Sequence, residues 1–152
     1  MKGKYIILEL IPSHSNPEKG SIIQLQALKL DGLMLLDRFD YRLREDLISN
    51  DDLREMVSYD KDMFHYVDDS IQIVNDFKKW IGKMKLLIID NYYTMDYLKE
   101  IKNKKESIFK YLDLEFSDDV IDKVIDKYQL ETSNHIVDLL YEALINESNK
   151  KK

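Results

Sequence analysis

The chain has 152 residues, of which 44% are hydrophobic and 34% are charged, a composition typical of one soluble globular domain with a real core. It contains no cysteine, which excludes disulfides and thiolate metal sites, so redox chemistry gives no sign of its compartment. The formal net charge of −6 argues against a surface that binds nucleic acid all round, but not against a local basic groove.

The first residues, MKGKYIILELIPS, place a charge before an apolar run, as a signal peptide does. They lack a small-residue cleavage site and are predicted to form a strand instead. No stretch approaches the roughly 20 apolar residues of a membrane span, so no membrane partner is expected and the predicted location is the cytoplasm. We expect a single domain over residues 1–148, followed by a basic tail over residues 149–152.

The first predicted strand runs from Lys4 to Leu10, and Glu9 is the only acid in its apolar run. A run of this kind predicts a central strand that is covered on both faces. An ionised carboxylate is costly in such a place. Glu9 is therefore expected either to reach water at the end of the strand or to have a partner.

Two further strands are predicted to complete an antiparallel meander. The segment PSHSNPEKG predicts a turn, and residues 21–30 predict a strand of alternating type, with Gln24, Gln26 and Leu28 on one face. Asp31 and Gly32 are a hairpin signal, and LMLLDRFDYRL after them supplies the third strand.

The middle of the chain has helical periodicity. A short helix is predicted over residues 49–57, and a longer one begins between Asp68 and Ser70 and ends at Gly82. Its apolar stripe, which we interpret as core and not as a binding platform, consists of Ile71, Ile73, Val74, Phe77, Trp80 and Ile81.

The remaining pattern returns to a strand and then to helices. A fourth strand is predicted over residues 85–90, and helices over residues 95–101, 118–128 and 134–145. The lysines of EIKNKKES and of the C-terminus are expected to be solvated surface. This order predicts an α/β fold whose mixed sheet combines antiparallel hairpins with a parallel crossover.

Several stretches of the sequence resemble a known family. They are the opening YIILEL and NPEKGSIIQLQALKLDG, then DDLREMV and DDSIQIVNDFKKWIG followed by KLLIIDNYYTMDYL, and the closing SNHIVDLLYEAL. Over roughly residues 4–146 the layout and apolar pattern resemble the DnaQ-like (DEDDh) 3'-5' exonucleases. The resemblance implies the ribonuclease H-like fold, in which a three-strand antiparallel meander and parallel strands form one mixed sheet flanked by helices.

The resemblance also implies a metal site. Members of this family are expected to hold two divalent ions, Mg²⁺ or Mn²⁺, with four carboxylates and to use a histidine as general base. The carboxylates are an Asp-x-Glu on the first strand, an Asp opening the helix after the fourth strand, and an Asp on the last helix. The histidine lies five residues before that last Asp. Two such cations need several anionic oxygens, because one ion activates water and both stabilise the leaving oxygen.

This chain departs from that pattern at most positions. Glu9 falls where the first Asp is expected, and Ile11 where the Glu should be. Thr94 falls at the helix acid, Asp138 at the last acid and Ser133 at the histidine. The resemblance therefore leaves Glu9 and Asp138 as the remnant of a metal site. We expect no bound cofactor, with Mg²⁺ or Mn²⁺ as the ion if any metal binds.

Three nearby residues are weak catalytic candidates. Asp90 or Asp96 would have to replace Thr94 as a ligand, and His135 would have to act as base from a shifted position. The alternative interpretations are that Asp90 is a strand-end cap, Asp96 a first-turn acid of a helix, and His135 a surface or cap residue.

Two adjacent tyrosines follow the fourth predicted strand. Tyr92 and Tyr93 lie where the family has the mouth of its cleft, and their rings could stack on unpaired bases. Alternatively, one ring is core and the other is half-exposed packing.

Three functions remain open on this basis. The first is a degenerate exonuclease-fold domain that no longer cuts and acts as a protein-binding or scaffold module. The second is a metal-dependent 3'-5' exonuclease on single-stranded DNA or RNA with a rewired site. The third is a nucleic-acid-binding module that does not cleave, which predicts a basic strip reaching the cleft.

Overall fold

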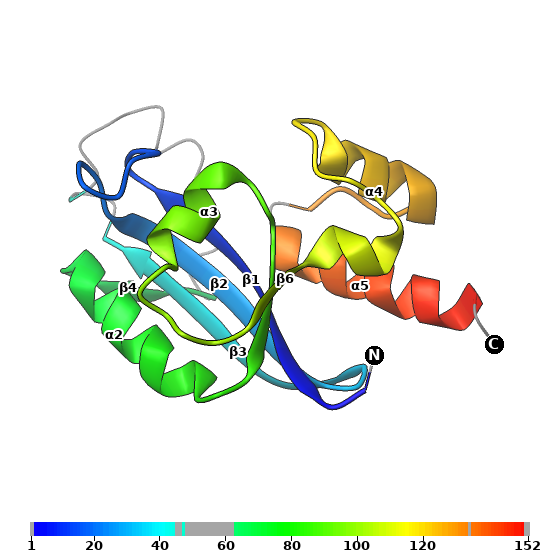
Figure 1. The fold of residues 1–152 in the computed structure, drawn as a ribbon, viewed down its shortest axis with the longest axis horizontal. Coiled ribbons are helices and arrows are strands. Elements are labelled where there is room, and N and C mark those ends of the chain that lie inside the picture. Colours follow the sequence, from blue (N-terminus) through cyan, green and yellow to red (C-terminus); the bar gives the residue numbers. More distant parts are fainter. Residues whose placement is uncertain (1, 45–46, 48–62, 134, 151–152) are drawn as a thin grey trace.

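The computed structural model describes residues 2–44, 47, 63–133 and 135–150. A six-stranded sheet in the order β4-β3-β2-β1-β5-β6 forms its centre, with helices on both faces (Figure 1). The strands are β1 (Lys4–Pro12), β2 (Ile22–Asp31), β3 (Met34–Leu43), β4 (His65–Val67), β5 (Lys85–Ile88) and β6 (Lys105–Ser107). The helices are α2 (Ser70–Ile81), α3 (Tyr92–Tyr97), the 3-10 helix η2 (Ile108–Leu112), α4 (Val120–Tyr128) and α5 (Ile136–Lys150).

The sheet is mixed, as predicted. Strands β1, β2 and β3 pair antiparallel in chain order, and β5 pairs parallel with β1. The hairpin expected at Asp31–Gly32 is confirmed: Gly32 has a φ of 61°, and its carbonyl accepts a 2.6 Å hydrogen bond from the Tyr5 hydroxyl. The predicted α/β class with its antiparallel meander and parallel crossover is therefore confirmed.

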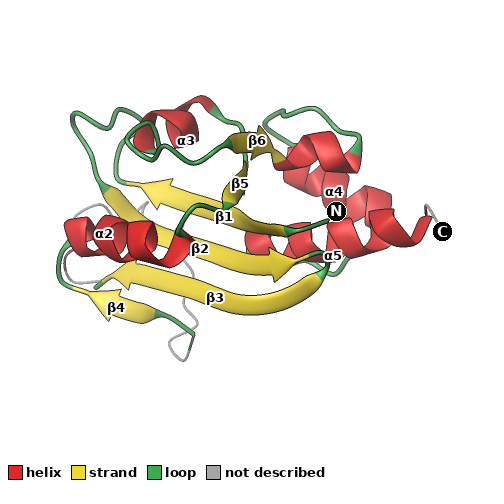
Figure 2. Cartoon of the chain, turned by 60° about the horizontal axis from the view of Figure 1, so that its bottom comes forward, coloured by secondary structure: helices red, strands yellow, loops and turns green. Residues whose placement is uncertain are grey.

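Each face of the sheet has its own core. Tyr5 and Ile7 of β1 pack with the side chains of η2, α4 and α5, whereas Ile6 and Leu8 pack with α2 on the other face (Figure 2). Because successive residues of a strand point to opposite faces, β1 supplies both cores. The prediction of a central strand covered on both faces is confirmed.

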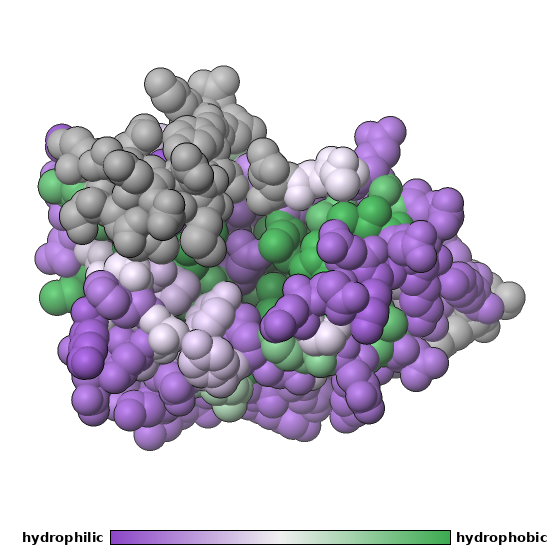
Figure 3. Space-filling model, turned by 90° about the horizontal axis from the view of Figure 1, so that it is seen from above, coloured by the Kyte–Doolittle hydropathy of each residue, from purple (hydrophilic) through white to green (hydrophobic). Residues whose placement is uncertain are grey.

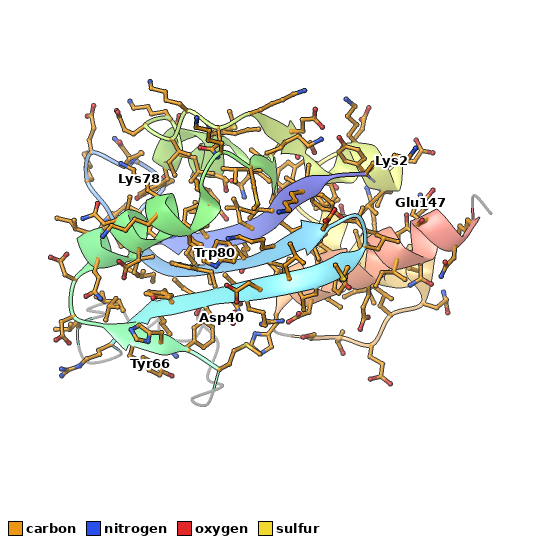
Figure 4. All side chains as sticks on the ribbon, turned by 90° about the horizontal axis from the view of Figure 1, so that it is seen from below. Lys2, Asp40, Tyr66, Lys78, Trp80 and Glu147 are labelled. Atoms are coloured by element: carbon orange, nitrogen blue, oxygen red, sulfur yellow. The ribbon has the colours of Figure 1, made fainter. Side chains whose placement is uncertain are left out.

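Helix α2 begins after Asp69, whose carboxylate accepts a 2.9 Å hydrogen bond from the Ile71 backbone N–H. Trp80, in the last turn of α2, lies at the edge of the core between this helix and the sheet. Its ring centroid is 5.4 Å from that of Phe39 (Figure 4). Ile71 does not join this core and is 65% exposed, because it lies on the first turn and borders a shallow depression beside Pro17. Its assignment to the buried stripe was wrong.

Strand β2 also differs from its prediction. Gln24 and Gln26 were expected on an alternating strand, but both are buried, at 1% exposure each, since helices cover both faces of the sheet. The two edge strands β4 and β6 were not predicted, because three residues are too few to show a period. Lys105 from the basic segment EIKNKKES lies in β6 and is half-buried.

The predicted helix boundaries shift by a few residues. Helix α3 begins at Tyr92, not at residue 95, and α5 begins at Ile136 and continues to Lys150. The helix predicted over residues 49–57 lies outside the described residues. Within the described segments, no helix has the length and apolar character needed to cross a membrane.

Candidate functional site

A pocket of about 330 Å³ lies at the edge of the sheet where the parallel strands β1 and β5 both end. Its apolar walls consist of Leu10, Ile89, Phe116, Val120, Ile121 and Ile136. Polar groups come from the end of β1, the start of α3 and the residues before α4. Viewed from above, apolar residues gather around a hollow on this side of the molecule, and hydrophilic residues lie below and to the right of it (Figure 3). The volume is at the lower end of the range for ligand pockets, about 300–1,000 Å³.

Glu9 projects into this pocket from β1. It shares a face with Tyr5 and Ile7, and within the described segments no hydrogen bond or ion pair holds its carboxyl group. The Glu9 side chain is half-buried, and this loss of contact with water raises the pKa of Glu9 from 4.5 to about 7. The acid noticed in the sequence is therefore a poorly solvated carboxyl that faces a cavity.

Tyr92 and Tyr93 line the same pocket from the first turn of α3. Burial is the main cause that raises the pKa of the Tyr93 hydroxyl, and the nearby Glu9 carboxylate raises it further. Tyr92 is 71% exposed as a residue, and its ring lies edge-on to that of Tyr93, with 5.8 Å between ring centroids. Three of the residues singled out in the sequence are thus brought together here.

The start of α3 is fixed by Asn91. Its side-chain oxygen accepts a 2.9 Å hydrogen bond from the Thr94 backbone N–H, so Asn91 is the N-cap of the helix. Thr94, at the position of the family's helix acid, is buried at 2% exposure and lines the pocket. A hydroxyl group therefore stands where the resemblance implies a carboxylate.

Asp138 lies in a separate constellation on the first turn of α5. Arg38 of β3 binds it with two nitrogens: Nη1 is 2.7 Å from Oδ1 and Nη2 is 3.2 Å from Oδ2. The Arg38 Nε also donates a hydrogen bond of 3.1 Å to Asp40 Oδ2. Asp40, which lies two residues further along β3, is labelled in Figure 4. Burial opposes the charge of Arg38, but the hydrogen bonds to Asp138 and Asp40 outweigh it and raise the Arg38 pKa.

Gln26 lies between the Glu9 pocket and the group formed by Arg38, Asp40 and Asp138. In the sheet register it is opposite Glu9 on one side and Asp40 on the other. Its Nε2 donates a 2.9 Å hydrogen bond to Asp40 Oδ1 and is 3.4 Å from Nδ1 of His135. Asp138 is not among the residues that line the Glu9 pocket. The two acids of the remnant metal site thus have different surroundings.

The residues present do not fit the metal pair that the resemblance implies. Across the described part of the chain, no three acidic, histidine or cysteine side chains are placed to hold a metal ion together. Glu9 faces a largely apolar pocket, and both carboxylate oxygens of Asp138 already accept hydrogen bonds from Arg38. A divalent ion at Asp138 would have to compete with the guanidinium of Arg38 for these oxygens.

The three weak catalytic candidates are not among the residues that line the Glu9 pocket. The His135 carbonyl accepts hydrogen bonds from the Asp138 and Leu139 backbone N–H groups, at 3.0 and 3.3 Å, directly before α5. Asp90 accepts a 2.8 Å hydrogen bond from the Ser107 hydroxyl and does not line the pocket.

Asp96 is exposed and lies one residue before the end of α3. Its interpretation as a first-turn acid was wrong. The reason is that the helix begins at Tyr92, directly after its Asn91 cap, and not near residue 95.

Three residues of the Asp138 group were not identified as site members from the sequence: Gln26, Arg38 and Asp40. A signal was present in DRFDYR, where Arg38 and Asp40 alternate with the aromatic residues and therefore share one face of β3. Charges that point inward from a strand need partners, which here come from β2 and α5.

The sheet order and the helices on its two faces define an α/β fold of the ribonuclease H-like kind, with a pocket at the strand ends. The solved structure of the zinc-bound form of E. coli ExoI in complex with single-stranded DNA matches this chain with a TM-score of 0.60 and 8% identity. The match covers 100% of this chain and 42% of that one. The fold expected from the sequence is thus confirmed.

One curated relative is similar in sequence, the DNA polymerase III PolC-type of Bacillus subtilis (strain 168). It is 21% identical over 144 residues, which cover 86% of this chain and 10% of the relative. This similarity agrees with the resemblance to DnaQ-like exonucleases. No protein-family model matches the chain. The chain spans less than half the length of either protein.

Proposed function

We propose that the chain is an exonuclease-fold domain that does not cleave nucleic acid and acts as a protein-binding or scaffold module. The observation that carries this proposal is the bidentate ion pair between Arg38 and Asp138. Asp138 falls at the last acidic position of the family. In this chain the guanidinium supplies the positive charge that divalent ions supply in a two-metal site.

The other positions of the pattern support the same conclusion. Ile11 cannot bind a metal ion, and Thr94 and Ser133 are neutral hydroxyls. Two-metal catalysis needs several anionic oxygens around one small volume. Of the two acids on the pocket lining, Glu9 and Asp118, only Glu9 falls at a metal-binding position of the pattern, and it lies beside Thr94.

A protein partner agrees with the charge of the molecule. The net charge is −6, which opposes the approach of a polyanion. The pocket has exposed aromatic side chains on its lining, with Tyr92 at 71% and Phe116 at 40% exposure. Exposed aromatic side chains beside a small apolar pocket are typical of surfaces that bind proteins.

Isothermal titration of Mg²⁺ and Mn²⁺ into metal-free protein, followed by incubation with labelled single-stranded DNA and RNA, tests the proposal. We expect no tight binding of two ions and intact substrate. Binding of two ions with loss of 3'-terminal nucleotides, abolished in Glu9→Ala and Asp138→Ala, would show instead a metal-dependent exonuclease with a rewired site.

A nucleic-acid-binding module that does not cleave is the second candidate. It is favoured by the exposed Tyr92 ring and by the single-stranded DNA named for the structural neighbour ExoI. Binding of labelled single strands that weakens steeply with added salt, without cleavage, would support this candidate over a protein-binding module. The cytoplasmic location remains a prediction from the sequence.

A further inference from the structure

The pocket at the ends of β1 and β5 has an unusual charge pattern. Two carboxyl groups, those of Glu9 and Asp118, lie on its lining. Among the described residues that line it, none is a lysine, arginine or histidine. Among the described lining residues, the formal charges are therefore all negative, and the apolar walls weaken the screening of these charges by water.

Glu9 is the group in this pocket that most lacks a partner. Its carboxyl accepts no hydrogen bond within the described segments, and burial raises its pKa to about 7. A cationic donor would satisfy this carboxyl through a charge-assisted hydrogen bond. The rings of Tyr92 and Tyr93 line the same space, and aromatic faces attract cations as well.

The size of the pocket limits what enters it. About 330 Å³ accommodates one large side chain or a small ligand, and most of the wall is apolar. An apolar group attached to a cation fits both the wall and Glu9. A nucleotide fits less well, because its phosphate would face Glu9 and Asp118 with no cation among the described lining residues.

We propose that this pocket binds one aromatic or apolar side chain of a partner protein together with an adjacent arginine or lysine whose charged group reaches Glu9. The inference rests on the proposed function as a protein-binding module and specifies the chemistry of the partner. The apolar side chain contacts the wall near Ile89 and Ile121, and the cation lies between Glu9 and the tyrosines.

Three peptides that differ at one position, which is positive, neutral or negative, test this proposal. They are Ac-Gly-Trp-Arg-Gly-NH₂, Ac-Gly-Trp-Gln-Gly-NH₂ and Ac-Gly-Trp-Glu-Gly-NH₂, titrated at pH 8 into the full ¹⁵N-labelled chain and followed by NMR. We expect the arginine peptide to bind at least about tenfold more tightly than the glutamine peptide, the effect of one charge-assisted hydrogen bond. The shifts should be largest at the amides of Tyr93, Thr94 and Ser117.

Two variants assign the preference to one carboxyl group. Glu9→Gln removes the charge in the pocket, and it should bring the arginine peptide to the affinity of the glutamine peptide. Glu18→Gln makes the same change at an exposed loop residue and should leave the preference intact. Equal loss of preference in both variants would mean that overall charge, not the pocket, selects the peptide, and would overturn the proposal.

Further outcomes separate this inference from the proposed function. If the glutamate peptide binds as tightly as the arginine peptide, the inference fails, whereas the proposed function is decided by metal titration and cleavage. If tryptamine binds more tightly than the arginine peptide, the site prefers a free aromatic amine, and the assignment to a protein segment is overturned. Cleavage of single strands would overturn the proposed function whatever the peptides do.

Discussion

At the scale of single residues, Glu9 shows how one side chain makes stability depend on pH. Burial raises its pKa from 4.5 to about 7. Between these pH values the unfolded chain loses the proton while the folded chain keeps it, so folding stability falls as the pH rises. The full effect, reached above pH 7, is at most about 3 kcal/mol.

Glu9→Gln is therefore expected to stabilise the protein at pH 8 and to leave its stability unchanged at pH 4, where the carboxyl is neutral in both states. Urea unfolding at the two pH values measures this difference. Glu18→Gln is the control and should show no such difference. If Glu9→Gln changed the free energy of unfolding equally at pH 4 and pH 8, packing and not the charge would cause the change.

The candidate site could be predicted only in part from the sequence. Glu9 could be found because an acid inside an apolar run needs an explanation that the local sequence lacks. Arg38 could not be assigned a partner, because Asp138 lies 100 residues further along the chain. Its pairing depends on how α5 packs on the sheet, which no local pattern specifies.

At the scale of elements, the ion pair of Arg38 joins strand β3 to helix α5. We expect Arg38→Met to lower the free energy of unfolding by about 2 kcal/mol, since it leaves the Asp138 and Asp40 carboxylates uncompensated. Both members of the pair keep partial exposure, 29% for the Arg38 side chain and 32% for that of Asp138, so water screens part of the loss.

A double-mutant cycle with Asp138→Asn measures the coupling between the two residues. Lys123→Met, which breaks the exposed pair with Asp119 within the α4 segment, is the matched control and should cause no measurable change. A coupling energy near zero would contradict a role of the Arg38 pair in attaching α5 to β3.

The elements themselves were predictable to different degrees. Strand β1 and helix α2 have long, regular patterns, and their periods indicated them correctly. Helix α3 was placed too late because its cap, Asn91, directly follows the residues of the preceding strand segment and its first turn contains two tyrosines. Short parallel edge strands such as β6 depend on a partner strand and leave almost no local signal.

At the scale of the whole molecule, the two cores share their central strands. Ile7 and Leu87 belong to the core under α5, and Leu8 and Leu86 to the core under α2. Because neither core can lose these strands without exposing the other, we expect the chain to unfold in one cooperative transition.

Trp80 gives a direct test, because it is the single tryptophan of the chain and lies at the edge of the α2 core. Its fluorescence and the far-ultraviolet circular dichroism, which reports all the helices, should give the same urea midpoint. Separate midpoints would mean that the α4–α5 side unfolds independently of the α2 side.

The pocket lining combines the end of β1, the start of α3, the segment before α4 and the first residue of α5. Any molecule that occupies it touches parts of the chain as far apart as Glu9 and Ile136. By mass action, such a molecule raises the melting temperature of the protein even when it binds weakly, provided that its concentration is high. Resistance to heat is therefore a reporter for screening peptide libraries, and the library member that protects the fold most identifies a sequence that the pocket binds.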